Sequence, residues 1–116
     1  MGDRALVQFK DKDDTISPVI YLHWNGTEVK YWLEEWYRLI QGRQRDLDYG
    51  CARFVGICHS HIEGNLSLGV NYQPTELTAD DSHGDAGCFV VNVSTGEVTA
   101  SGGYGESFQL KEETIN

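Results

Sequence analysis

Basic residues are scarce in this sequence, and their scarcity argues against one class of function. Lys and Arg together number 9 against 18 Asp and Glu, so the net charge of the 116 residues is −9. Binding to DNA or RNA without sequence preference requires clustered cations that neutralise phosphates. An acidic surface instead keeps a protein well solvated, or meets a basic protein partner. We therefore predict no direct binding to nucleic acid.

Cysteine and long apolar runs are also scarce. Cys51, Cys58 and Cys88 are an odd number of cysteines without a CxxC pair, which is typical of reduced thiols in a cytosolic protein. No apolar run approaches the roughly 20 residues of a membrane-spanning helix, and no apolar leader is present. The sequence predicts a cytoplasmic protein that makes no contact with a membrane.

The residues that are present suffice for one hydrophobic core. Hydrophobic residues make up 40% of the chain and include three Trp, six Tyr and four Phe, which is far from the composition of a disordered chain. A chain of this length forms a single domain. We expect that domain to span residues 1–105, followed by a polar C-terminal tail over residues 106–116.

Two helices are predicted from the spacing of apolar residues. In residues 28–41 these residues recur at i, i+3, i+4 and i+7, which places them on one helical face. A second stripe with the same spacing runs over residues 51–62, and glycines follow both segments, as is common at helix ends. The first stripe is Val29, Trp32, Leu33, Trp36, Tyr37 and Ile40, and the second is Cys51, Phe54, Val55, Cys58 and Ile62.

Strands are predicted on both sides of the helices. Residues 5–9 and 18–24 form a hairpin, and residues 66–70, 88–93 and 97–101 form three later strands. Residues 88–93 are apolar on both faces, so we expect that strand inside the sheet. The order ββααβββ predicts an α+β fold, with an antiparallel sheet of about five strands covered by a two-helix hairpin.

Residues 48–70 contain the second apolar stripe and a polar corner at its C-terminal end. The run Cys58-His59-Ser60-His61 suggests a metal site, but helical residues two apart diverge by about 200° and cannot share a ligand face. Ser60 lies between two histidines, yet sequence adjacency does not create a nucleophile–base geometry. We therefore predict no metal, no cofactor and no catalysis. A small hydrolase or metal enzyme that uses His59 and His61 is the least favoured alternative.

Several residues suit the recognition of a nucleotide. An arginine guanidinium binds phosphate bidentately, and an aromatic ring such as Tyr104, between glycines, offers a flat face to a base. The plainer explanations are surface salt bridges for the arginines at positions 38, 43, 45 and 53, and a mobile hairpin end for residues 102–105. The candidate ligand-binding residues are Trp24, Asn25, Arg53, His61, Asn65, Asn71 and Tyr104.

Five segments carry a resemblance to known proteins: RALVQF, YLHWNG, ARFVGICHSHIEGNLSLGV, GDAGCFVV and GGYG. Together they resemble small phage and prophage proteins with an anti-defence role, over the whole chain except the tail. Within that set the chain is similar to the phage anti-Thoeris nucleotide sponges, which are small oligomers that sequester a cyclic ADP-ribose-type signal without turning it over. The resemblance implies a homo-oligomer in the host cytoplasm that captures a nucleotide-type immune signal.

The charge of the chain supports an alternative from another class. Acidic residues concentrate in residues 11–14, in residues 76–85 and in the tail. An acidic protein–protein inhibitor, such as an anti-CRISPR protein, would use such a surface to cover the basic face of a host defence complex. The two hypotheses differ in the partner, which is a small molecule in the first and a protein complex in the second.

Overall fold

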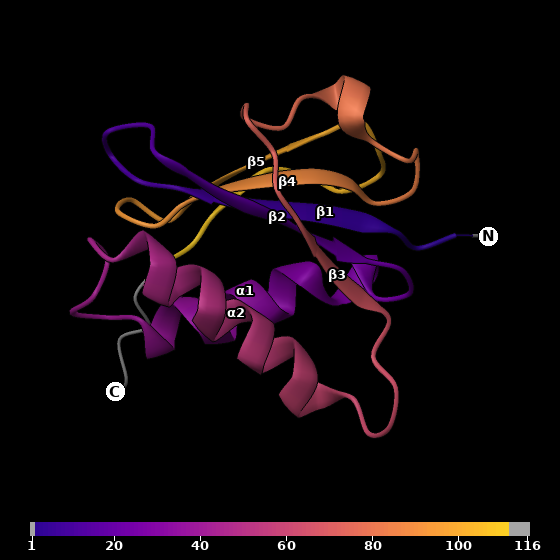
Figure 1. The fold of residues 1–116 in the computed structure, drawn as a ribbon, viewed down its shortest axis with the longest axis horizontal. Coiled ribbons are helices and arrows are strands. Elements are labelled where there is room, and N and C mark those ends of the chain that lie inside the picture. Colours follow the sequence, from indigo (N-terminus) through magenta and orange to yellow (C-terminus); the bar gives the residue numbers. More distant parts are fainter. Residues whose placement is uncertain (1, 112–116) are drawn as a thin grey trace.

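A computed structural model describes residues 2–111 of the chain, and it confirms the α+β class. One six-stranded sheet carries two α-helices on one face, while an irregular segment crosses the other face (Figure 1). The strands are β1 (Ala5–Lys10), β2 (Ile16–Leu22), β3 (Leu68–Asn71), β4 (Gly87–Asn92), β5 (Glu97–Ser101) and β6 (Phe108–Gln109). The helices are α1 (Val29–Leu39) and α2 (Leu47–His61), and two short 3-10 turns are η1 (Gly26–Glu28) and η2 (Ala79–Asp81).

The sheet is mixed, and the prediction of a wholly antiparallel sheet is wrong. Its strand order is β3-β2-β1-β4-β5-β6, and the central pair β1 and β4 runs parallel. After β3 pairs with β2 at one edge, residues 72–86 carry the chain over the face opposite the helices. Strand β4 then enters on the free side of β1 in the same direction. A strand that is apolar on both faces fits either direction, so its composition could not settle this point.

Helix α1 packs on the sheet through its predicted stripe, whereas in α2 only Phe54 and Cys58 of the predicted stripe are fully buried. The other buried residues of α2 are Leu47, Gly50 and Ile57. Trp36 of α1 is fully buried, and its ring centroid lies 4.8 Å from that of Phe9 on β1. The indole Nε1 donates a hydrogen bond of 2.7 Å to the carbonyl oxygen of Gly50 on α2. A Cβ at position 50 would lie 3.3 Å from the Trp36 ring, so glycine lets the two helices approach closely. This contact joins both helices to the centre of the sheet.

A second, smaller core lies on the opposite face of the sheet, under residues 72–86. Gln8 of β1 is fully buried there and fastens the crossing segment. Its Nε2 donates to the carbonyl oxygens of Ser17 and Thr75, both at 3.2 Å, and its Oε1 accepts from the Leu77 amide at 2.8 Å. The apolar residues of this core are Leu6, Val19, Leu77, Cys88 and Val90.

The C-terminal segment contributes more than the expected polar tail. Phe108 and Gln109 form β6 beside β5, and Leu110 is buried in the main core. Apolar side chains at alternate positions, Phe108 and Leu110, hold this short strand. The rest of the predicted tail, residues 112–116, lies outside the described residues. In the described part of the chain, neither α-helix is long and apolar enough to cross a membrane.

The three cysteine thiols are free and differ in burial. Burial raises the pKa of Cys58 to about 12 and that of Cys88 to about 11, and both side chains are fully buried. Burial also raises the pKa of Cys51, but this residue is partly exposed. Because the thiolate is the reactive form, Cys58 and Cys88 are both shielded and unreactive in the folded protein.

This difference gives a testable expectation for thiol labelling. At mildly alkaline pH, a disulfide reagent should modify folded protein slowly and only at Cys51, whereas the urea-unfolded chain should react at all three cysteines. Mass spectrometry after labelling counts the modified sites. Folded Cys51→Ser protein is the matched control and should stay unmodified. Rapid labelling of Cys58 in folded protein would contradict the packing of α2 described above.

Candidate functional site

Polar and aromatic side chains gather at one end of the sheet. The parallel strands β1 and β4 begin at this end, and the antiparallel strands β2 and β5 finish there. Four connecting segments therefore meet: residues 2–4, 23–28, 82–86 and 102–107. We call this region the polar end of the sheet; in Figure 1 it lies on the side of the N-terminus.

Asp3 connects three of these segments on the helix side of the sheet. Its carboxylate accepts hydrogen bonds from the backbone amide of Thr27, at 3.1 Å, and from the hydroxyl groups of Thr27 and Tyr104. Partial burial raises the pKa of Asp3, but these hydrogen bonds outweigh it and lower the pKa below its ordinary value. The bond to Asp3 raises the pKa of Tyr104 to about 12, so the phenol remains a donor at neutral pH.

Arg4 reaches the opposite face, as the alternation of side chains along a strand requires. Its Nε lies 2.7 Å from Oδ2 of Asp85, and its Nη2 donates to the carbonyl oxygen of His83 at 3.1 Å. Hydrogen bonds from the Arg4 side chain and backbone amide lower the pKa of Asp85. Asp3 and Arg4 thus fix the connections on both faces at the same end of the sheet.

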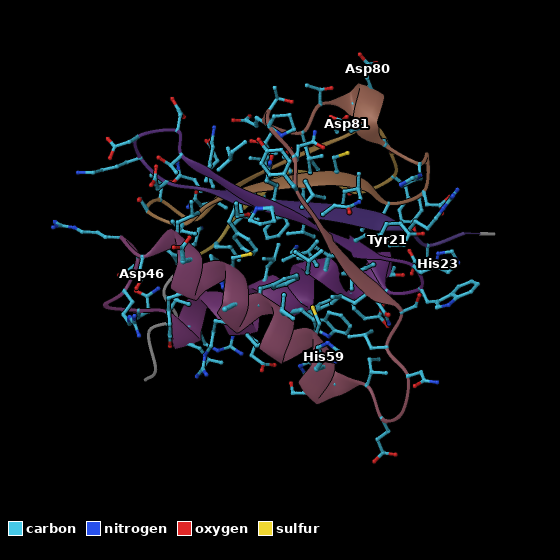
Figure 2. The ribbon with its side chains drawn as sticks, viewed as in Figure 1. Tyr21, His23, Asp46, His59, Asp80 and Asp81 are labelled. Carbon is cyan, nitrogen blue, oxygen red and sulfur yellow. The ribbon has the colours of Figure 1, made fainter. Side chains whose placement is uncertain are left out.

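An imidazole and aromatic cluster adjoins Arg4. The hydroxyl of Tyr21 contacts Nδ1 of His23, and the His83 ring packs edge-on against Tyr21 at 5.5 Å between centroids. Trp24 packs edge-on against His23 at 4.3 Å and remains 63% exposed. Figure 2 shows Tyr21 and His23 together at this end of the sheet. In this cluster His83 and Trp24 are exposed, and Tyr21 and His23 are partly buried.

A hollow of about 330 Å³ lies beside Asp3, between the start of α1 and the segment that leads into β6. Phe89 of β4 is nearly fully buried beneath it, and Lys30 Nζ lies 5.4 Å from the centroid of the Phe108 ring. A Cβ at Gly105 would come within 2.4 Å of the Phe89 ring, so the backbone is pressed against that ring. The lining residues are Gly26, Thr27, Lys30, Phe89, Tyr104, Gly105, Glu106, Ser107 and Phe108.

The structure divides the predicted ligand-binding residues between separate places. Trp24, Asn25 and Tyr104 lie at the polar end of the sheet, and Asn25 immediately precedes the turn η1 that lines the hollow. Asn65 is exposed in the connection between α2 and β3, and Asn71 is exposed at the end of the edge strand β3. The polar corner of residues 48–70 therefore does not join Tyr104 in one site.

Arg53 and His61 are both on α2, near Glu35 of α1. Arg53 and Glu35 line a shallow groove between the two helices. His61 Nε2 lies 2.8 Å from Glu35 Oε1, and the His61 ring stacks on Trp32 at 5.5 Å with an interplanar angle of 4°. His61 thus joins the end of α2 to α1.

The predicted basic region around the helix connection is partly neutralised by salt bridges. Arg43 lies 2.7 Å from Asp46 and stacks 3.6 Å above the centroid of the Tyr49 ring. Asp46 also caps α2 by accepting a hydrogen bond from the Tyr49 amide. For Arg43 the structure therefore supports the salt-bridge explanation. Within residues 2–111, no three His, Cys, Asp or Glu side chains are grouped closely enough to hold a metal ion.

Sequence reasoning missed several residues of the polar end, namely Asp3, Arg4, Tyr21, Lys30, His83, Asp85, Phe89 and Phe108. Their partners are distant along the chain: Arg4 and Asp85 are 81 positions apart, and Asp3 and Tyr104 are 101 apart. The available signal was indirect, because a polar residue just before a strand often lies at a sheet end.

Comparison of the chain with protein-family models, curated proteins and solved structures finds no match.

Proposed function

We propose that this protein is a binding protein that captures a nucleotide-type small molecule in the hollow at the polar end of the sheet. The observation that carries this proposal is the composition of the hollow, where three aromatic rings and the opposite charges of Lys30 and Glu106 surround about 330 Å³. Ligand pockets in proteins span roughly 300–1,000 Å³ and combine apolar walls with a few polar groups. The hollow therefore suits one nucleoside-sized part of a ligand.

The lining groups match the parts of a nucleotide. The rings of Tyr104 and Phe108 offer faces on which a base can stack, an interaction worth about 1–3 kcal/mol per base. The Lys30 ammonium supplies a positive charge for a phosphate, and the hydroxyl of Ser107 can bond to a ribose. Asp3 holds Tyr104 in place through its hydroxyl, which limits the loss of side-chain entropy when a ligand binds.

The biological role that we propose follows from the resemblance to the anti-Thoeris sponges. The captured molecule is a nucleotide-derived immune signal of the cyclic ADP-ribose type, which the protein holds without turnover. Sequestration lowers the free signal concentration in the host cytoplasm and so blocks the defence response. Such a protein must be present in amounts comparable to those of the signal, because each binding site retains its ligand.

The proposal is tested by thermal shift and calorimetry with a panel of cyclic ADP-ribose isomers, ADP-ribose, AMP and NAD. We expect at least one of these to raise the Tm, and heat-denatured complex to release it unchanged. Lys30→Ala should weaken its binding about tenfold or more, since a hydrogen bond to a charged group contributes about 1.5–3 kcal/mol. Lys12→Ala removes the same charge from the exposed β1–β2 turn and is the matched control.

Two outcomes would contradict ligand capture in the hollow. One is the absence of any Tm rise or heat of binding across the whole panel. The other is binding that Lys30→Ala and Lys12→Ala reduce equally, because the effect would then reflect net charge and not the hollow. Product that accumulates beyond the protein concentration would show turnover, which contradicts sequestration.

A second candidate function is supported by the position of the acidic residues. The turn η2 projects from the face of the sheet opposite the helices, and its Asp80 points outward (Figure 2), whereas the Asp81 carboxylate caps the turn by accepting a hydrogen bond from the Thr78 amide. Both side chains are exposed, as are Asp13 and Asp14 in the turn between β1 and β2. An acidic protein–protein inhibitor would present these carboxylates to a basic surface of a host complex. This is the function that we favour if no nucleotide binds.

A further inference from the structure

Strand β3 forms one edge of the sheet, so half of its backbone groups face away from any other strand. The His23 amide donates to the Ser67 carbonyl oxygen at 3.2 Å, and Tyr21 stands opposite Gly69. Hydrogen-bonded pairs alternate along an antiparallel ladder, so the backbone groups of residues 67, 69 and 71 face β2. Those of Leu68 and Val70 consequently face outward.

The side chains around this edge are apolar. The alternation of a strand directs Leu68 and Val70 to the same side, and Val70 is 54% exposed; Tyr72, just after the strand, is 85% exposed. Leu66 and Leu68 are partly buried and pack against the main core. The outward hydrogen-bonding groups therefore lie next to apolar surface that water still reaches.

The same edge carries no charge. Residues 64–75 contain no Asp, Glu, Lys or Arg, although the chain as a whole has a net charge of −9. Edge strands of soluble proteins are commonly protected against pairing by charged side chains, especially Lys. Strand β3 has four residues and lacks this charged protection, which leaves its edge open to pairing.

We propose that the β3 edge binds a second copy of this chain, whose own β3 adds antiparallel and continues the sheet across a two-fold axis. Two molecules with a net charge of −9 repel each other, and a contact between two neutral surfaces adds no local repulsion between like charges. A two-fold contact places the same neutral edge on both sides, so it adds no such repulsion. A basic partner would instead be matched by acidic residues at the edge, and residues 64–75 contain none.

Sedimentation velocity over a range of micromolar concentrations tests this interface in the full-length protein. We expect the wild type to form a dimer. Val70→Pro removes one outward amide, and Val70→Lys places a charge in the contact, so each should raise the dimer Kd at least about tenfold. Thr99→Lys adds the same charge to an exposed position of β5, which has neighbouring strands on both sides, and should leave the Kd unchanged.

Circular dichroism confirms that each variant is folded before its sedimentation is interpreted. A wild type that stays monomeric at the highest concentration overturns the proposal, as does a dimer that both Val70 variants leave intact. A monomer purified with an extended peptide on this edge also overturns it, because the occupant is then another chain. The β3 edge is separate from the hollow, so failure of nucleotide binding does not affect this result.

Discussion

Replacing Trp36 by alanine should lower the free energy of unfolding by about 4 kcal/mol, the middle of the range for a buried aromatic residue. The substitution leaves a cavity beside Phe9 and deprives the carbonyl oxygen of Gly50 of its indole partner. Domains of this size have total stabilities of about 5–15 kcal/mol, so the loss is a large fraction. Urea unfolding followed by circular dichroism measures the change.

The chain contains a matched control for this experiment. Trp24 is the same residue type but is 63% exposed, so Trp24→Ala should change the free energy of unfolding by no more than about 0.5 kcal/mol. Trp36→Phe retains one aromatic ring but removes the donor and the volume of the second ring, and its cost should fall between the two. Equal losses for Trp24→Ala and Trp36→Ala would show that Trp36 does not join the helices to the sheet as described.

Replacing Gln8 by leucine should cost about 3 kcal/mol, although the new side chain is apolar and the site is buried. The substitution removes the partners of the Leu77 amide and of the carbonyl oxygens of Ser17 and Thr75. A buried polar group left without a hydrogen bond costs about 1–3 kcal/mol. We expect the segment 72–86 to open locally, which hydrogen exchange at the Leu77 amide reports together with urea unfolding.

Gln109→Leu is the control for Gln8→Leu. The amide of Gln109 also donates to backbone carbonyl oxygens, those of Thr95 and Leu110, but the residue is exposed on β6. Water can replace these bonds, so the expected loss is below about 1 kcal/mol. If Gln8→Leu were neutral or stabilising, the crossing segment would not depend on Gln8 for its position.

Much of the fold was predictable because short-range patterns determine it. The apolar stripe from Val29 to Ile40 requires one buried helical face, and all six of its residues are buried. Residues 97–101 form β5 with the predicted bounds, and residues 88–93 overlap the buried strand β4. In each case the pattern repeats within a few residues, so the neighbouring residues alone are sufficient to predict the element.

The direction of β4 and the existence of β6 were not predictable in the same way. The side chains of β4 indicate burial on both faces, but its neighbour and its direction depend on the path of residues 72–86. The two residues of β6 are too few for a periodic pattern, and the apolar residues Phe108 and Leu110 were the only signal of docking. The direction of a strand and the pairing of a very short strand depend on contacts between residues that are distant along the chain.

The candidate site was the least predictable part. Trp24 and Tyr104 were predicted as ligand-binding residues, and the structure places both, exposed, at one end of the sheet. The polar groups around them come from strand ends that are remote in sequence, such as Asp3 and Asp85, and no motif links these residues. Because β1 and β4 are parallel, both begin at this end, and this strand direction was the information that sequence reasoning lacked.

The parallel pairing of β1 with β4 also determines the order in which the protein can assemble during synthesis. Strand β1 is synthesised first. Strands β2 and β3 and both helices can pack with it before Gly87, the partner of Ala5, is synthesised. At about 5–20 residues per second, the other side of β1 stays unpaired for several seconds. A nascent chain in that interval exposes a central strand to other chains, so the middle of the sheet closes late.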